Sequence, residues 1–226
     1  MESSIQKPIR SDLKVIVIGA SGTGKTSFVN KFAKNQFSES YKATIVSEFG
    51  FKIVEVNGNS YRVQLWDIAG QDKGGSMTKI FAKDSHGCVI LSQVDKPETM
   101  EDTIKWKKSV DDSSTFIDGG QIPCILIQNK IDLIEDQSKV EEIKQRMTTF
   151  CEKNNFVNGF VTSVKEGINV DESMKYLIDL IVDRLEKYAA LGHDVFHNPN
   201  ARHTIKLESN THKKELKRED KKDCCK

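Results

Sequence analysis

A glycine-rich stretch near the N-terminus has the residue types and spacing of a phosphate-binding loop. Residues 19–26 read GASGTGKT and match the pattern G-x-x-x-x-G-K-[ST]. In such a loop the glycines let backbone N–H groups turn toward phosphate oxygens, Lys25 neutralises the β- and γ-phosphates, and the Thr26 hydroxyl can ligate Mg²⁺. The motif predicts a bound nucleoside triphosphate, but it occurs in ATPases, nucleoside kinases and GTPases alike.

A second motif, Asn129-Lys130-Ile131-Asp132, indicates which base is bound. The Asp132 carboxylate can accept hydrogen bonds from guanine N1–H and from the exocyclic amine, a pair of donors that adenine does not offer at that edge. Asn129 would hold the other side of the purine, and the stem of Lys130 would cover its face. The motif follows a predicted strand, at the end where α/β sheets bind ligands, and therefore predicts guanine.

These motifs must be positioned by buried strands and the helices between them. The apolar, β-branched run 13–18 predicts a strand just before the phosphate loop, and a helix is expected after Gly24. Two further runs flank an Asn-Gly turn, which predicts a hairpin and hence one antiparallel strand. The two runs of the hairpin are 48–56 and 61–66. The other expected strands are 87–93, 122–128 and 156–162, and the expected helices lie around 98–111, 139–153 and 170–185.

The alternation of strands and helices predicts an α/β fold with a six-stranded, mostly parallel sheet and helices on both faces. We expect a short N-terminal extension at 1–11 and a GTP-binding domain at 12–191. Residues 192–226 are polar and irregular in sequence, which predicts a disordered, hypervariable tail.

Composition narrows the class of protein further. The formal net charge of +1 gives no reason to expect nucleic acid as a partner, and 226 residues fit one domain with extensions. We find no signal peptide and no apolar run long enough for a membrane span, which predicts a protein kept in the cytosol. Cys88, Cys124 and Cys151 lie in apolar surroundings and are expected to be core thiols rather than parts of a disulfide framework.

Together with DIAGQ at 67–71 and TSVK at 162–165, the two motifs make the chain resemble a Rab-family small GTPase of the Ras superfamily, over about 13–191. The resemblance implies a P-loop GTPase fold that binds GTP or GDP with Mg²⁺ and hydrolyses GTP to GDP and phosphate. The nucleotide-binding residues that it implies are Ser21, Gly22, Thr23, Gly24, Lys25, Thr26, Ser27, Phe37, Thr44, Gly70, Asn129, Lys130, Asp132, Ser163, Val164 and Lys165.

The resemblance also implies roles in hydrolysis. Gln71 would be the catalytic residue that orients the attacking water, and Gly70 would donate its N–H to the γ-phosphate. Thr26 and Asp67 would hold Mg²⁺, the latter through water. Thr44 lies eighteen residues after Thr26, where the family places the switch threonine that ligates Mg²⁺ only in the triphosphate state.

On the side of the base, the resemblance implies two further contacts. Phe37, eleven residues after Thr26, falls where the family packs an aromatic ring beside guanine. The backbone of the loop at 162–165 would touch the guanine oxygen. Val164, where the family usually has alanine, adds bulk there.

Several stretches resemble the Rab branch of lysosome-related organelles and phagosomes. These are DIAG at 67–70, SMTKIF at 76–81, IKWKKSV at 104–110 and the long polar insert at 113–121.

Other positions depart from the usual Rab pattern. Val46 and Ser47 replace a glycine and a valine, which predicts a stiffer first switch with a different surface. Asp72, Lys73 and Gly74 replace the usual E-R-F, so an aromatic side chain that partners commonly contact is missing. These changes predict altered partner recognition more than altered nucleotide binding.

The chain ends in two adjacent cysteines, Cys224 and Cys225, which resemble the Rab ending that carries two geranylgeranyl groups. Two lipid chains give stable anchoring where one does not. The other interpretation is that the pair has no function. Residues 213–226 carry a local charge of +3, which fits either weak attraction to an anionic membrane or a solvated spacer.

The leading hypothesis is a monomeric, membrane-anchored GTPase switch on the cytoplasmic face of an endomembrane, with a cytosolic pool, in vesicle or endolysosomal trafficking. The resemblance implies an exchange factor, a GTPase-activating protein, effectors and prenylation and escort proteins as partners. The sequence has no evident arginine finger, so hydrolysis should be slow without an activating protein. One alternative is a nucleotide-locked interaction module with little hydrolysis. Another is a metabolic P-loop kinase, which the guanine motif and the tail disfavour.

Overall fold

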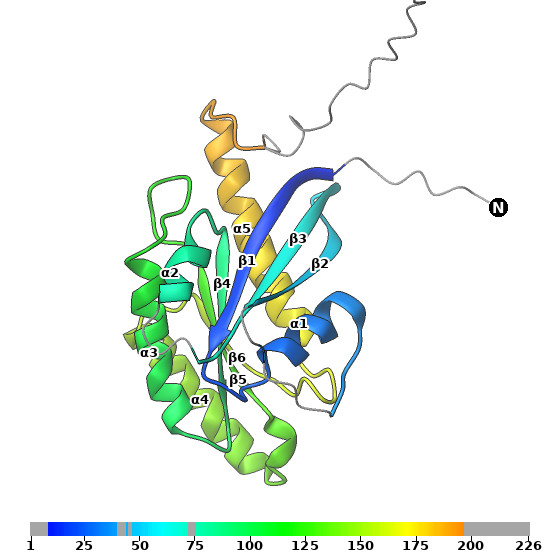
Figure 1. Ribbon diagram of the computed structural model, residues 1–226, viewed down its shortest axis with the longest axis vertical. Coiled ribbons are helices and arrows are strands. Elements are labelled where there is room, and N and C mark those ends of the chain that lie inside the picture. The colour runs from blue at the N-terminus through cyan, green and yellow to red at the C-terminus, as the bar shows by residue number, and fades with distance from the viewer. Residues whose placement is uncertain (1–8, 40–43, 45–46, 72–75, 197–226) are drawn as a thin grey trace, which may run out of the picture.

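A single six-stranded sheet forms the centre of the molecule (Figure 1). The computed structural model describes residues 9–39, 44, 47–71 and 76–196. The strands lie in the order β2-β3-β1-β4-β5-β6, and only β2 and β3 pair antiparallel. The strands are β1 (Ile9–Gly19), β2 (Ser47–Val56), β3 (Asn59–Ile68), β4 (Gly87–Gln93), β5 (Cys124–Asn129) and β6 (Asn158–Val161).

Helices cover both faces of this sheet. In Figure 1, α1 and α5 lie on one side, and α2, α3 and α4 lie on the other. The helices are α1 (Lys25–Lys34), α2 (Ser76–Ala82), α3 (Glu98–Asp111), α4 (Gln137–Lys153) and α5 (Val170–Ala190), with a 3₁₀ turn η1 (Ile131–Leu133). The predicted α/β fold, with six strands and one antiparallel pair, is confirmed.

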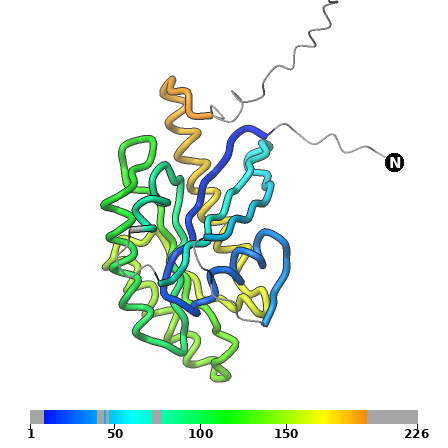
Figure 2. Tube along the Cα trace, in the orientation of Figure 1, coloured from blue at the N-terminus to red at the C-terminus, as the bar shows by residue number. Residues whose placement is uncertain are grey.

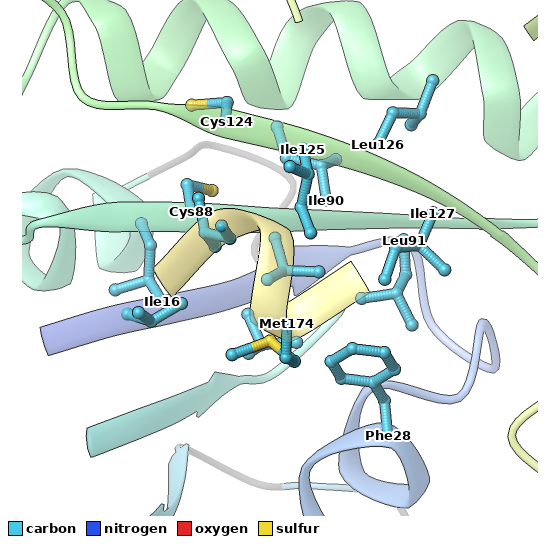
Figure 3. Close-up of a cluster of buried hydrophobic side chains, with 14 of the residues drawn as sticks. Ile16, Phe28, Cys88, Ile90, Leu91, Cys124, Ile125, Leu126, Ile127 and Met174 are labelled. Carbon is cyan, nitrogen blue, oxygen red and sulfur yellow. The ribbon is translucent and has the colours of Figure 1, made fainter. Parts of the chain in front are cut away.

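The core lies where parallel strands are buried on both faces. Residues 15–18 of β1 and 124–127 of β5 are all fully buried, as expected for apolar runs in the middle of a parallel sheet. Figure 3 shows Phe28 of α1 and Met174 of α5 on the side of the sheet to which Leu91 points. Cys88, Cys124 and Cys151 are free and buried, which confirms them as core thiols.

The folded part of the chain extends past both expected ends of the domain. Ile9 already pairs with Ser60 of β3, so β1 begins inside the expected extension at 1–11. At the other end, Val195 and Phe196 pack against the core although they follow the expected boundary at 191. The Arg10 guanidinium lies 3.9 Å from the centre of the Phe196 ring, which joins the two ends. Figure 2 shows the start of β1 and the end of α5 at the same end of the molecule.

Two predicted strands are shorter than expected. The run at 122–128 includes Pro123, which has no N–H to donate to a ladder, and β5 begins only at Cys124. Residues 156 and 157 lie outside β6, although the Val157 N–H still donates to the Cys124 carbonyl. Neither α2 nor η1 was expected from the sequence pattern.

The polar insert at 113–121 is folded against the domain. Phe116 is buried, its N–H donates to the Gly120 carbonyl at 2.6 Å, and the Arg184 side chain of α5 lies 4.1 Å from its ring centre. Arg184 also pairs with Asp118 at 2.6 Å. One aromatic side chain and one arginine therefore hold this insert, which its polar composition did not indicate.

No helix in the part of the chain that the structure describes is long and apolar enough to cross a membrane. The rest of the expected tail at 192–226, from residue 197 onward, lies outside the described residues.

Candidate nucleotide and magnesium site

The phosphate loop lies where its motif requires, between a buried strand and the first turn of a helix. β1 ends at Gly19 and α1 begins at Lys25. Gly24 has a φ of +95°, and a Cβ at this position would lie 2.5 Å from the Asn129 side-chain amide nitrogen. Only glycine combines this backbone conformation with so close an approach. The helix N-terminus adds potential that favours an anion at the loop.

Lys25 is held inside the loop. Its Nζ donates to the carbonyls of Gly19 and Ala20 at 3.0 and 2.9 Å, and the side chain is almost fully buried. Burial lowers the pKa of Lys25 to about 8, although the nearby Asp67 carboxylate acts in the opposite direction. An anion at the loop would favour the charged form, so this lysine is suited to take up a proton when phosphate binds.

Three oxygen-bearing side chains from separate segments meet beside the loop. The hydroxyls of Thr26 and Thr44 are hydrogen-bonded at 2.8 Å. Asp67 Oδ2 accepts a short hydrogen bond from the Thr26 hydroxyl and a longer one, at 3.4 Å, from the Thr44 hydroxyl. The structure therefore brings together the three residues that the sequence suggested for Mg²⁺.

Asp67 supports the fit to a cation. Its side chain is fully buried, and Oδ1 has no hydrogen-bond partner among the described residues. Burial raises the pKa of Asp67, while the Thr26 hydrogen bond and the Lys25 charge oppose this shift. A buried carboxylate with an unpaired oxygen next to two hydroxyls is the hard oxygen set that Mg²⁺ prefers.

Gly70 lies directly against the phosphate loop. A Cβ at this position would be 2.5 Å from the Ser21 backbone nitrogen and 2.6 Å from Lys25 Nζ. This close approach fits the expected contact of its N–H with a terminal phosphate. Gln71 follows and is exposed, next to residues 72–75, which lie outside the described residues.

Asn129 connects the guanine motif to the phosphate loop. Its Nδ2 donates to the Thr23 carbonyl at 2.9 Å. Its Oδ1 accepts from the Thr162 hydroxyl and from the Val164 N–H, both at 3.1 Å. The sequence suggested a contact with the purine, and the structure shows that this side chain also holds three loops together.

The carboxylate of Asp132, which is expected to contact the base, is hydrogen-bonded to a serine. Asp132 Oδ1 accepts from the Ser163 hydroxyl at 2.6 Å, which orients the half-buried carboxylate and leaves its other oxygen for a ligand. Lys130 has a φ of +68°, a left-handed conformation at the turn between β5 and η1. The expected guanine site is therefore assembled from 129–132 and 162–165.

Val164 and Phe37 are the remaining residues expected on the side of the base. The Val164 side chain is buried in the core, and its N–H is already bonded to Asn129, so a guanine oxygen would have to share that donor or use a neighbouring one. Phe37 is 38% exposed. Two residues later, Glu39 pairs with Lys165 at 3.2 Å, which links the segment after α1 to the guanine loop.

An aromatic cluster beside the site was not singled out from the sequence. The Phe49 and Trp66 rings are 5.4 Å apart, edge to face, and Trp66 lies 5.7 Å from Phe81 of α2. Phe49 is half exposed. The predicted hairpin could have indicated it, because Phe49 and Trp66 are cross-strand partners.

Comparisons with known proteins agree with this geometry. Residues 14–183 match the model of the Ras family. The human Ras-related protein Rab-32 is 34% identical over 94% of this chain and 88% of its own length. Rab-32A of Dictyostelium discoideum is 38% identical over 75% of this chain and 77% of its own length, and human Rab-7L1 is 36% identical over 74% and 80%. The chain belongs to the Rab family of Ras-related small GTPases, which hydrolyse GTP to GDP.

Proposed function

We propose that this Rab-family GTPase, which acts in membrane trafficking as its family does, works as a slow, lipid-anchored switch on an endomembrane, in vesicle or endolysosomal trafficking. The observation that carries the proposal is the meeting of Thr26, Thr44 and Asp67 at one point. These residues come from α1, from the segment before β2 and from β3. A ligand at this point therefore couples the phosphate loop to the segments on either side of the β2–β3 hairpin.

Triphosphate binding would stabilise one arrangement of those segments. Mg²⁺, when bound, supplies charge neutralisation for the phosphates, with Thr26, Thr44 and Asp67 as the residues that would hold it. Lys25 binds the phosphate charge, and Gly70 approaches closely enough to donate its N–H to a terminal phosphate. Loss of the γ-phosphate removes the contacts of Thr44 and Gly70, so their segments relax.

Hydrolysis of GTP depends on the positioning of the attacking water and on charge stabilisation, and it needs no covalent intermediate with the protein. Gln71, directly after Gly70, would orient the attacking water through its side-chain amide. Turnover by this chain alone would be slow, and an arginine inserted by an activating protein could raise it by about 10³- to 10⁵-fold.

Partners would sense the change of state through the aromatic cluster of Phe49, Trp66 and Phe81. This cluster lies between the two segments, because Phe49 is only five residues after Thr44 and Trp66 directly precedes Asp67. Half-exposed aromatic side chains of this kind are common in the centre of protein interfaces. Ser47 and Gly74, which depart from the usual Rab pattern, lie near the cluster in sequence, and they would restrict the set of effectors and regulators.

The membrane anchor would be a pair of lipids on Cys224 and Cys225, residues outside those that the structure describes. To test the function as a membrane switch, full-length wild type and Cys224→Ser/Cys225→Ser are expressed in cells and fractionated. We expect the double variant in the soluble fraction with its nucleotide binding intact. The single variant Cys224→Ser should bind membranes weakly and reversibly, because one chain gives only marginal anchoring. Recovery of the double variant with membranes at the wild-type level would refute the lipid anchor.

A further inference from the structure

A groove lies between α1, β2 and α5, three elements that lie next to one another at one side of the molecule (Figure 1). It encloses about 320 Å³. Its apolar lining comes from Phe32 of α1, Val54 and Val56 of β2 and Ile178 of α5. Phe32 and Ile178 belong to the core, whereas the two valines are only half-buried. The groove therefore exposes apolar surface on an edge strand, away from the nucleotide site.

The rim of the groove is acidic. Its charged residues are Lys52, Glu55, Asp171, Glu172, Lys175 and Asp179, which gives four carboxylates against two lysines. Both lysines already pair with rim carboxylates, Lys52 with Asp171 and Lys175 with Asp179. Lys52 Nζ also lies 4.3 Å from the centre of the Phe32 ring. A ligand that fits this groove has apolar side chains flanked by positive charge.

The C-terminal tail of this chain contains such a segment. Residues 202–207 read RHTIKL, with Ile205 and Leu207 two positions apart and with Arg202 and Lys206 beside them. Side chains two positions apart point to the same side of an extended chain. An extended segment would therefore place its two aliphatic side chains on one side, toward the lining, and its two basic side chains on the other, from which their long stems would reach the rim.

The tail starts near the C-terminal end of α5, whereas the groove lies along the N-terminal half of this helix. Arg10 pairs with Glu186 at 3.3 Å and lies against the Phe196 ring, so Phe196 sits near the C-terminal end of α5. From Glu186 back to Asp171, the far end of the groove, α5 rises by roughly 22 Å. Ile205 is nine residues after Phe196, and nine extended residues span up to about 30 Å. The whole length of the groove is within reach.

We propose that residues 202–207 of the tail bind in the groove between α1, β2 and α5, with Ile205 and Leu207 on its apolar lining. Binding within one chain is favoured because the tether keeps the local concentration of the segment high. The inference goes beyond the proposed function and does not depend on the lipids. If the lipid anchor is present, docking shortens the free chain before Cys224 from 27 to 16 residues and brings the domain closer to the membrane.

The proposal can be tested by disulfide trapping in the full-length chain. In a Cys224→Ser/Cys225→Ser background, Thr204→Cys is combined either with Lys175→Cys in the groove or with Lys187→Cys outside it. The two lysines are matched, because both side chains are 75% exposed on α5 and each pairs with an aspartate. Dilute protein is oxidised under mild conditions, and the formation of the monomeric disulfide is followed over time on non-reducing gels.

If the segment docks, the Lys175→Cys pair should close about tenfold faster than the Lys187→Cys pair, although Lys187 is nearer to the start of the tail. Ile205→Ser with Leu207→Ser should remove this difference, whereas Leu216→Ser, farther along the tail, should not. Equal rates for the two pairs, a rate unaffected by the Ile205 and Leu207 changes, or a disulfide found only in dimers would overturn the proposal. Nucleotide content, measured on the same samples, shows separately whether the GTPase site is intact.

Discussion

The Asn129 side-chain amide donates to the Thr23 carbonyl at 2.9 Å, and this bond joins the guanine motif to the phosphate loop. Both groups are buried. The position of the guanine motif and the position of the phosphate loop therefore depend on each other. A change at Asn129 should weaken the binding of the phosphates as well as the binding of the base.

Asn129→Ala should raise the dissociation rate of GDP by roughly 10- to 100-fold, because a buried carbonyl without its donor costs about 1–3 kcal/mol. The rate can be followed with a fluorescent GDP analogue. Asn154→Ala is the matched control, since Asn154 Nδ2 also donates to a backbone carbonyl, at 2.8 Å, but at the end of α4. An equal effect of the two substitutions would contradict the linking role of Asn129.

Asp132→Asn should shift the preference of the protein from guanine toward xanthine nucleotides. The substituted amide can donate to the carbonyl that xanthine has where guanine has an amine. Competition between GDP and xanthosine diphosphate measures the change. Asp136→Asn serves as the control, because Asp136 also accepts from a serine, Ser138, but only caps α4. Unchanged preference for GDP would refute the role of Asp132.

The lowered pKa of Lys25 predicts proton uptake when nucleotide binds. In the free site this pKa is about 8, and bound phosphates should raise it. Binding of GDP at pH 8.5 should therefore take up roughly 0.7 of a proton, whereas binding at pH 7 should take up little. Calorimetry in two buffers of different ionisation enthalpy measures the uptake on nucleotide-free protein. No uptake at pH 8.5 would mean that Lys25 is already charged in the free site.

His86 should make the fold sensitive to acid. Its Nδ1 accepts from the Lys14 N–H at 3.0 Å, and burial, followed by the Lys14 charge, lowers its pKa. Because the unfolded chain then binds the proton more tightly, stability is fully present above about pH 6.5. It falls as the pH drops toward the lowered pKa, by up to about 1.4 kcal/mol per pH unit.

Urea unfolding at pH 7.5 and pH 5.5 tests the role of His86. The wild-type midpoint should fall at the lower pH, and His86→Gln should reduce that fall because it removes the titrating group. His193→Gln is the control, since His193 is exposed and stacks on Tyr188. An unchanged pH dependence in His86→Gln would assign the acid sensitivity to other groups.

The strands and the site could be predicted because their signals are local. The run at 13–18 and the Asn57-Gly58 turn specify a buried strand and a hairpin. The phosphate and guanine motifs then follow strand ends, so the topology brings them together. The resemblance to the Rab family, supported by the spacing from Thr26, indicated Thr44, whose hydroxyl meets Asp67.

The features that sequence reasoning missed depend on contacts between distant residues. α2 has only seven residues and follows two glycines, so its sequence carries too little periodicity to indicate a helix. Phe116 and Ile117 are the two large apolar residues of a polar insert, and nothing local shows that Arg184, 68 residues after Phe116, packs on the Phe116 ring. Ile9 and Phe196 join the fold through Ser60 and Arg10, partners that no local pattern can name.

The most direct test of the proposed switch is single-turnover hydrolysis of GTP loaded on the purified protein with Mg²⁺, comparing wild type with Gln71→Leu. The Gln71 side chain is exposed beside Gly70, so its loss should leave GTP binding intact. We predict slow wild-type hydrolysis and a clearly lower rate in the variant, both alone and with an activating protein. If wild type and Gln71→Leu hydrolyse GTP at equal, negligible rates, and an activating protein does not make the two rates differ, the proposed switch is contradicted. A nucleotide-locked interaction module would then be favoured.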